Sequence, residues 1–393
     1  MLRESVIGHF FRLEPWLVKA IKKTDRKSVT GMRGLSMQYL FKMNLVMAIV
    51  FGLTGCGGIF SASNSSGAGA LLDIFWPKAD ISDSKDGWVD GMDAGDGMVG
   101  SGKWDNRFFI DFSGVELTAS DSFIIEKAGI ESLSIPAFAG SDLGTSYNDD
   151  DTATVRDEIF AGITTAFAGV DVELLTEEPS SGPYSTVYIG GSNFTGTDNV
   201  LGVAPLDFNN FSGEDLIFVF SEAYEDATSS GSKDILINVA AHEIAHSIGA
   251  RHIDSDDATL NPVVRSDTDS FDVSADVVGE DDDEENTKDL LVWTVGAADG
   301  GDPAGLPTIV DLAMVSDGDV GQLSIYSPAN AAANPDLNFN SYEYDWSFDG
   351  RSASGPTVRI LFEGEVGSTF GVQLTVSSSD GSAATYDFKI NKK

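Results

Sequence analysis

The hydrophobic positions between residues 105 and 305 alternate between short strand-like runs and two stretches at helical spacing. The strand-like runs lie at 107–112, 122–125, 170–175, 186–190, 200–204 and 216–220. One helical stretch contains Val155, Ile159, Phe160, Ile163 and Phe167. The other, at 235–248, is rich in Ile, Leu, Val and Ala, as a buried helix requires. The order of strand, helix, several strands and helix predicts an α+β domain over 105–305.

From about residue 306 the pattern changes to short strands separated by turns rich in Gly, Ser, Asn and Asp. The candidate strands lie at 308–315, 321–326, 342–348, 357–362, 370–376 and 383–390, a spacing that predicts an all-β sandwich over 306–393. The segment Tyr344-Asp-Trp346-Ser-Phe-Asp-Gly350 resembles the polycystic-kidney-disease (PKD) type of immunoglobulin-like domain. We expect Trp346 to fill the core between the sheets.

The first 55 residues resemble an N-terminal extension followed by a bacterial lipoprotein signal peptide. The apolar run at 43–53 is too short to span a bilayer, and it ends in Leu53-Thr-Gly-Cys56. The resemblance implies cleavage before Cys56 and a lipid anchor on that cysteine. Because Gly57 is not acidic, it favours the outer membrane over the inner one. The alternative interpretation is that the apolar run is a buried segment of a soluble protein and that the Cys56 thiol is unmodified and has no function.

Residues 56–104 are rich in Gly, Ser and Asp, and they predict a tether between this anchor and the folded domain. The stretch 80–102 crowds Asp and Gly together, and 280–285 is a block of acidic residues. Each is interpreted either as a solvated loop or as a cation site, so Ca²⁺ is a candidate ligand.

The charge of the chain restricts its partners. It contains 24 Lys and Arg against 62 Asp and Glu, for a formal net charge of -38. Nucleic acid is therefore excluded as a partner, because phosphate binding needs a basic face. Cys56 is the only cysteine, which excludes an intramolecular disulfide.

Three of the four histidines lie in one stretch, His242-Glu-Ile-Ala-His-Ser-Ile-Gly-Ala-Arg-His252. On a helix, His242 and His246 project from one face, one turn apart. Gly249 lets the chain turn sharply out of the helix, so that His252 can return to the same point. Three imidazoles with one open position predict a catalytic Zn²⁺ site. Glu243 could take a proton from water that zinc has activated, which implies hydrolysis.

This stretch resembles the HExxHxxGxxH signature of the metzincin zinc endopeptidases. The resemblance implies that His242, His246 and His252 bind zinc and that Glu243 is the general base. It also implies a twisted, mainly parallel sheet with two long helices, and an edge strand at 201–205 that pairs with an extended substrate. Matrixins, one group of metzincins, place a methionine turn after the third histidine, and Leu260 occupies the Met position here.

These features predict a zinc-dependent endopeptidase for protein or peptide substrates, lipid-anchored at the bacterial cell envelope. The alternative is a catalytically weak or inactive surface adhesion or binding lipoprotein, which Leu260 favours and the intact Glu243 opposes. Hydrolysis of peptidoglycan is a third interpretation that the motif does not separate from proteolysis. The sequence does not indicate the oligomeric state.

Overall fold

The computed structural model describes residues 69–70, 97–101, 106–197, 199–224, 231–264, 270–278, 284–298, 305–317, 319–334 and 338–392. The predicted signal peptide, Cys56 and nearly all of the predicted tether lie outside these residues, as does most of the acidic block at 280–285. Among the helices described, none is both long and apolar enough to cross a bilayer.

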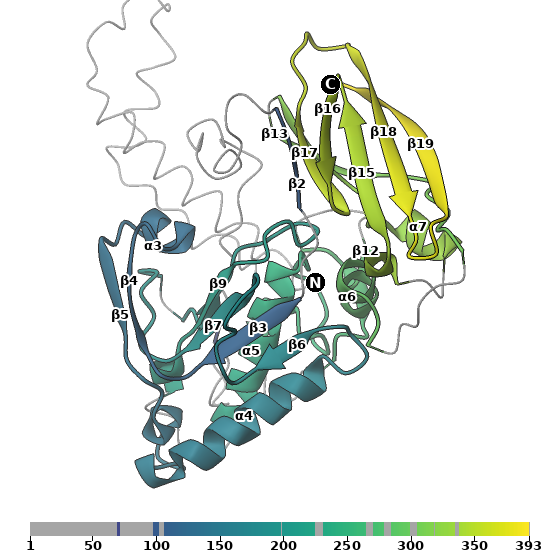
Figure 1. Cartoon of the computed structure of the whole chain (residues 1–393). Helices are drawn as coiled ribbons and strands as arrows, with labels where there is room; N and C mark the ends of the chain where they lie inside the picture. The colour runs from purple at the N-terminus through teal and green to yellow at the C-terminus, as the bar shows by residue number, and fades with distance from the viewer. Residues whose placement is uncertain are drawn as a thin grey trace, which may run out of the picture. The chain divides into compact units, whose positions relative to one another are not determined.

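A five-stranded sheet in the order β6-β3-β7-β9-β8 forms the centre of the α/β half (Figure 1). Its strands are β3 (Arg107–Asp111), β6 (Glu173–Leu175), β7 (Ser185–Ile189), β8 (Gly202–Val203) and β9 (Leu216–Val219). β3 runs parallel to β6 and β7, and β7 runs parallel to β9. β8 pairs antiparallel with β9 at the end of the sheet order, so the 200–204 run is an edge strand.

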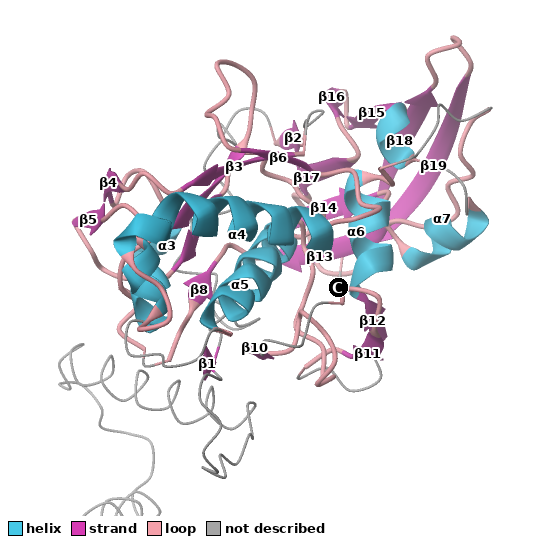
Figure 2. Ribbon diagram, turned by 90° about the horizontal axis from the view of Figure 1, so that it is seen from below, coloured by secondary structure: helices cyan, strands magenta, loops and turns pink. Residues whose placement is uncertain are grey.

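Two long helices, α4 (Thr152–Ala166) and α5 (Ser232–Ser247), lie side by side in this half (Figure 2). Val155, Ile159 and Ile163 are the buried positions of α4, at the four-residue spacing that the sequence predicts. They share one hydrophobic core with the sheet, with nearly all of α5, and with Leu291 and Val295 of α6 (Thr287–Val295). α5 is therefore held from all sides.

The run at 122–125 is not a strand, so that prediction is wrong. It begins helix α3 (Phe123–Lys127), because the Ser122 hydroxyl accepts a hydrogen bond from the Ile124 amide at 3.2 Å and caps the first turn. Ile124 and Ile125 pack against the hairpin of β4 (Val115–Thr118) and β5 (Ser132–Ile135). A four-residue apolar run fits either a strand or one buried helical turn.

Short elements complete this half. β1 (Gly69–Ala70) pairs antiparallel with β10 (Val263–Val264), and β11 (Ser274–Asp276) pairs antiparallel with β12 (Glu284–Asn286). 3₁₀ turns occur at Gly140–Leu143, Asp149–Asp151 and Ser221–Tyr224, and in the C-terminal half at Phe339–Ser341.

The C-terminal half contains two four-stranded antiparallel sheets, in the orders β13-β14-β17-β2 and β16-β15-β18-β19 (Figure 1). The strands are β13 (Ala313–Asp317), β14 (Val320–Ser324), β15 (Glu343–Phe348), β16 (Arg351–Ser354), β17 (Thr357–Leu361), β18 (Thr369–Ser377) and β19 (Ala383–Asn391), with a short helix α7 (Pro328–Ala333). Trp346 is fully buried in their common core and donates its indole N–H to the Gly355 carbonyl at 2.8 Å.

One strand of this sandwich comes from the other end of the chain. β2 (Met98–Gly100) pairs antiparallel with β17, and Met98 is buried in the sandwich core. The chain therefore contributes to the sandwich both before and after the α/β half. The resulting combination of a mixed α/β half with a β half is compatible with the predicted two-part architecture.

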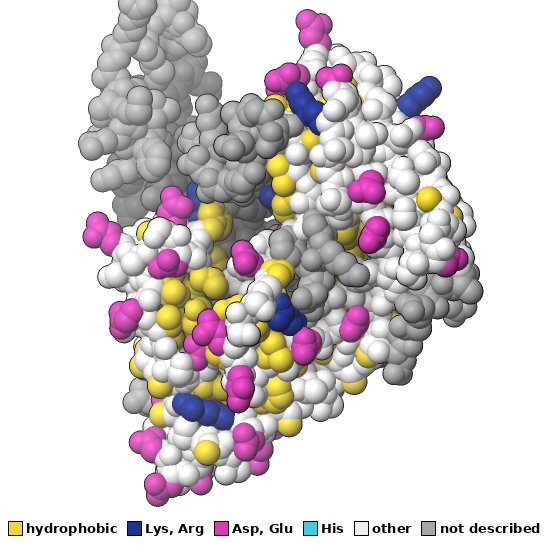
Figure 3. All heavy atoms as spheres, viewed as in Figure 1, with side chains coloured by type: hydrophobic (Ala, Val, Ile, Leu, Met, Phe, Trp, Pro, Cys, Tyr) yellow, Lys and Arg dark blue, Asp and Glu magenta, His cyan; other side chains and the backbone are white. Residues whose placement is uncertain are grey.

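Acidic side chains are spread over the face shown in Figure 3, where Lys and Arg are few. This distribution matches the acidic composition of the chain.

Candidate metal centre

Helix α5 carries His242 and His246 on adjacent turns, deep in the α/β core. Their exposed fractions are 0% and 1%, and the flanking Ala241 and Ala245 are also fully buried. The apolar residues around the helix fix its rotation, because each side of it packs against core. The two imidazoles are therefore held on rigid backbone.

Gly249 makes the turn that brings the third histidine back. The helix ends at Ser247, and Gly249 has φ of 108°, a left-handed conformation that favours glycine. Its amide donates to the His246 carbonyl at 2.9 Å, and the Ala250 amide donates to the Ala245 carbonyl at 3.0 Å. His252 then lies beside the helix, with its carbonyl accepting from the Val278 amide at 2.9 Å.

The three imidazoles converge through their Nε2 atoms. The Nε2 of His242 lies 2.7 Å from that of His246 and 3.0 Å from that of His252. At the other side of the rings, Nδ1 of His242 contacts the Thr259 carbonyl and Nδ1 of His246 contacts the Ala250 carbonyl, both at 2.6 Å. A carbonyl only accepts, so both Nδ1 atoms carry the proton of the neutral ring and both Nε2 atoms present a lone pair.

This arrangement fits a zinc ion. The two buried Nε2 atoms lie 2.7 Å apart, so their lone pairs repel each other, and a cation bound by both removes that repulsion. Neutral imidazole is a preferred zinc ligand, and a hydrogen bond from the other ring nitrogen to a carbonyl is the usual way to orient it. Within the described ranges, His242, His246 and His252 form the only cluster of three or more potential metal ligands, and no such cluster supports a calcium site.

Glu243 follows the first ligand and lies against the edge strand. Its exposed fraction is 1%. A Cβ on Gly202 of β8 would lie 2.7 Å from both Cγ and Oε1 of Glu243, so the bare backbone of the edge strand makes room for this carboxylate. Burial, and after it the negative charge of Glu243, raises the pKa of the Tyr224 phenol, which stays neutral at ordinary pH.

Leu260 belongs to the same core and follows a residue that orients a ligand. It is fully buried, and its carbonyl accepts from the Ile253 amide at 3.0 Å. The preceding residue, Thr259, supplies the carbonyl that holds His242. Leu260 therefore lies in the hydrophobic core that helix α5 shares, and its role at the Met-turn position stays a prediction.

We expect Leu260→Met to change the free energy of unfolding by less than about 1.5 kcal/mol, because the two side chains have similar volumes. Leu260→Ala should cost about 2–5 kcal/mol, because it leaves a cavity in the hydrophobic core that helix α5 shares. Denaturant unfolding of both variants checks this. A loss from Leu260→Met as large as that from Leu260→Ala would show that the site needs leucine itself, not just apolar volume.

Glu285 is a supporting residue that the sequence did not reveal, because it ends an acidic block interpreted as a solvated loop or cation site. Its exposed fraction is only 6%, and it accepts from the amide and the Nε of Arg251 at 3.0 and 2.9 Å. Burial raises the pKa of Glu285, and the bonds from Arg251 oppose that rise. Because Arg251 precedes His252, this ion pair fixes the segment that delivers the third imidazole.

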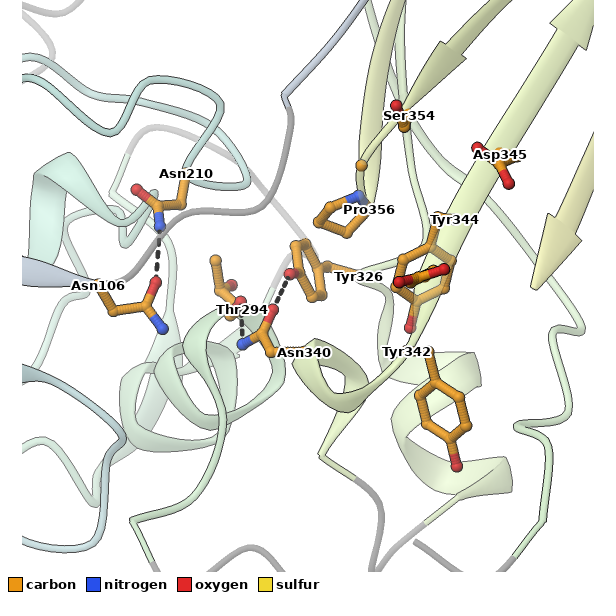
Figure 4. A pocket seen from close by; sticks show the side chains of 12 residues that line it. Asn106, Asn210, Thr294, Tyr326, Asn340, Tyr342, Tyr344, Asp345, Ser354 and Pro356 are labelled. Carbon is orange, nitrogen blue, oxygen red and sulfur yellow. Dashed lines mark hydrogen bonds between the residues drawn. The ribbon is translucent and has the colours of Figure 1, made fainter. Parts of the chain in front are cut away.

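A separate cavity of about 330 Å³ lies between the α/β half and the sandwich (Figure 4). Asn106, Asn210 and Thr294 line it from one side, and Tyr326, Tyr342 and Tyr344 from the other. The three tyrosine hydroxyls donate to Asn340 Oδ1 and to the carbonyls of Gly305 and Phe339 at 2.6–2.9 Å. Because these hydroxyls are engaged within the protein, we assign the cavity no chemistry.

Comparison with known families agrees with the metal centre. The sequence model of the matrixin family matches residues 184–283, which include β7, the edge strand and the three histidines. No curated protein matches the chain.

The similar solved structures include a catalytically inactive OgpA from Akkermansia muciniphila in complex with an O-glycopeptide (glycodrosocin) substrate. It is 12% identical, with 74% of this chain and 93% of that chain covered, at a TM-score of 0.20. Wild-type OgpA from the same organism is also 12% identical, with 75% and 93% covered, at a TM-score of 0.16.

Proposed function

We propose that this protein is a zinc-dependent endopeptidase of the metzincin type. The observation that carries the proposal is the convergence of three imidazole Nε2 atoms beside Glu243, with two of the rings locked by carbonyls in the metal-binding tautomer. The matrixin match over 184–283 and the sheet order with an antiparallel edge strand support the same assignment. In this proposal His242, His246 and His252 hold the zinc.

A bound zinc ion would supply Lewis acidity, which lowers the pKa of water and polarises a peptide carbonyl. Glu243 takes up the proton that the water loses as its oxygen bonds to the carbonyl carbon. Glu243 then gives this proton to the leaving nitrogen as the C–N bond breaks, so that the carboxylate is restored. The dry surroundings of Glu243 strengthen its electrostatic interactions during both transfers.

The substrate in this proposal is an extended protein or peptide segment. β8 lies at the edge of the sheet, next to the helix that carries Glu243, and an edge strand can pair with another extended backbone. Such pairing depends on backbone more than on side chains, which suits an enzyme that acts on unfolded protein.

The test is cleavage of a reduced and alkylated protein substrate by the purified full-length chain. We expect cleavage that a zinc chelator stops and that added Zn²⁺ restores. If the protein binds zinc but cuts none of several unfolded substrates, the endopeptidase assignment fails and the binding lipoprotein becomes the better assignment.

We further propose that Cys56 is lipidated and tethers the protein to the bacterial envelope, with residues 306–393 as a PKD-type domain. The lipobox-like segment ending at Cys56, and the two antiparallel sheets enclosing Trp346, support these assignments. Finding a peptide from residues 1–36 in the mature cellular protein by mass spectrometry would contradict the lipid anchor.

A further inference from the structure

The loop at 205–213, which lies between β8 and β9, packs against the turn that follows helix α5. The Asp207 amide donates to the His246 carbonyl at 3.2 Å, the same carbonyl that accepts from Gly249. A Cβ on Gly249 would lie 2.9 Å from the Asn209 nitrogen and 3.1 Å from the Asp207 oxygen, so the two backbones touch. A shift of this loop would therefore shift the turn between His246 and His252.

The loop contains two consecutive residues in the left-handed backbone conformation. Asn209 and Asn210 have φ of 64° and 48°. Asparagine is one of the few residue types besides glycine that adopts this conformation readily, so the loop sequence suits the turn that the chain makes here. Within the loop, the Asp207 carboxylate accepts from the Ser212 amide at 2.6 Å. Asn210 is also tied to Asn106, to whose Oδ1 it donates at 3.3 Å (Figure 4).

The sandwich supplies further contacts. Gln322 of β14 donates from Nε2 to the Phe208 carbonyl at 2.6 Å. The guanidinium carbon of Arg359, on β17, lies 3.7 Å from the centre of the Phe211 ring, a cation–π contact. The two residues are directly opposite each other in the β14–β17 pairing, and Arg359 Nε donates to Gln322 Oε1 at 2.9 Å. This hydrogen bond holds the Arg359 and Gln322 side chains together.

The positive charge of Arg359 also interacts with two carboxyl groups of the α/β half. Asp207 and Asp215 are both buried, at 9% and 8% exposed, and burial raises the pKa of both carboxyls. The positive charge of Arg359 opposes that rise in each case. The partly buried guanidinium of Arg359 thus lies where its charge favours the ionised forms of two buried carboxyls of the other half.

The strand order places Arg359 in the interior of a sheet of the sandwich. Arg359 pairs with Val99 of β2 on one side and with Gln322 of β14 on the other, so β17 is an inner strand. β2 precedes the α/β half and β14 follows it. The α/β half is therefore bracketed by two strands of the same sheet, and Arg359 lies between them.

We propose that Arg359 and Gln322 are positioning residues for the zinc site, which makes the sandwich a structural part of the catalytic unit in addition to any role as a spacer. Through the 205–213 loop they fix the turn that sets His246 and His252 at the correct separation. This inference rests on the proposed zinc site, but not on the identity of the substrate.

The test uses the full-length protein with Arg359→Met and Gln322→Met, which remove the polar contacts; methionine keeps the length of glutamine and replaces the aliphatic stem of arginine. Lys389→Ala, an exposed cation on β19 of the same sandwich, is the matched control. Three experiments are done well below the unfolding temperature. Chelator competition gives the Kd for zinc, steady-state kinetics give kcat and KM, and hydrogen exchange reports on the amides of Gly249 and Ala250.

We expect both Met variants to raise the zinc Kd by about 10–100-fold, the usual effect of losing support behind a ligand. Exchange at Gly249 and Ala250 should accelerate, and kcat should fall more than KM changes. Arg359→Lys should recover part of each effect, because it keeps the charge over Phe211. Lys389→Ala should change none of them.

The proposal is overturned if both folded Met variants keep the zinc Kd and the amide exchange of the unchanged protein. If Arg359→Met does not fold, Gln322→Met alone decides, since it removes only the hydrogen bonds to the Phe208 carbonyl and from Arg359 Nε and leaves the positive charge in place. Amide exchange needs neither zinc nor substrate. An endopeptidase assignment that failed would therefore leave this test intact.

Discussion

Replacing Glu243 with Gln should lower kcat for peptide cleavage by about 10²–10⁴-fold while the protein keeps its zinc and its stability. The carboxamide has the same shape, but it cannot take up the proton that water loses or return it to the leaving nitrogen. The imidazoles of His242 and His246 keep their orientation, because their Nδ1 atoms bond to the carbonyls of Thr259 and Ala250. Steady-state cleavage assays, with zinc content measured in parallel, check this.

A matched control is Glu222→Gln, which makes the same chemical change at an acidic residue in the turn before α5. Its carboxylate bonds to Ser192 and has no part in the proposed reaction. We expect Glu222→Gln to retain kcat. If Glu243→Gln cleaved peptides as fast as the unchanged protein, Glu243 would not be the general base, and the proposed mechanism of hydrolysis would be wrong.

The sequence predicts the metal centre well because its parts are local. The four-residue spacing of His242 and His246 on a helix, and a glycine that allows the turn to His252, are set by backbone geometry within eleven residues. The buried face of α4 follows from an equally short pattern, whereas the edge position of β8 is implied only by the metzincin resemblance. For the same reason the four-residue run at 122–125 misleads, since a single serine cap decides its structure.

What the sequence does not predict are contacts between distant segments. Glu285 belongs to an acidic block, and nothing in its neighbourhood indicates that it is buried against Arg251. Nor does the composition of 98–100, within a Gly- and Asp-rich stretch, indicate that it adds a strand to a sheet more than 200 residues further along the chain. Arg359 lies in an ordinary strand pattern, and only the folded chain brings it to Phe211. Local periodicity contains no information about such pairings.

The second large effect on kcat is expected from a substitution of Gly202 in the edge strand β8. Gly202→Ala should reduce kcat by about 10²-fold with little loss of stability, because a misplacement of about 1 Å can cost that much. The new Cβ would lie 2.7 Å from Cγ and Oε1 of Glu243 and 2.9 Å from Cγ1 of Val239. The Glu243 side chain can rotate away more easily than the helix can move, so the easiest relaxation displaces the carboxylate from its site.

Gly371→Ala is the control for this substitution, because Gly371 also lies in a strand, β18, and a Cβ there would meet no atom within 4 Å. We expect it to leave kcat and thermal stability unchanged. Zinc content should stay the same in both variants, since the atoms nearest to the new methyl group at position 202 belong to Glu243 and Val239, and none lies within 4 Å of the one at position 371. If Gly202→Ala kept the kcat of the unchanged protein, catalysis would not depend on the position of the Glu243 carboxylate against β8. The proposal that substrate binds along this edge strand, next to Glu243, would then lose its support.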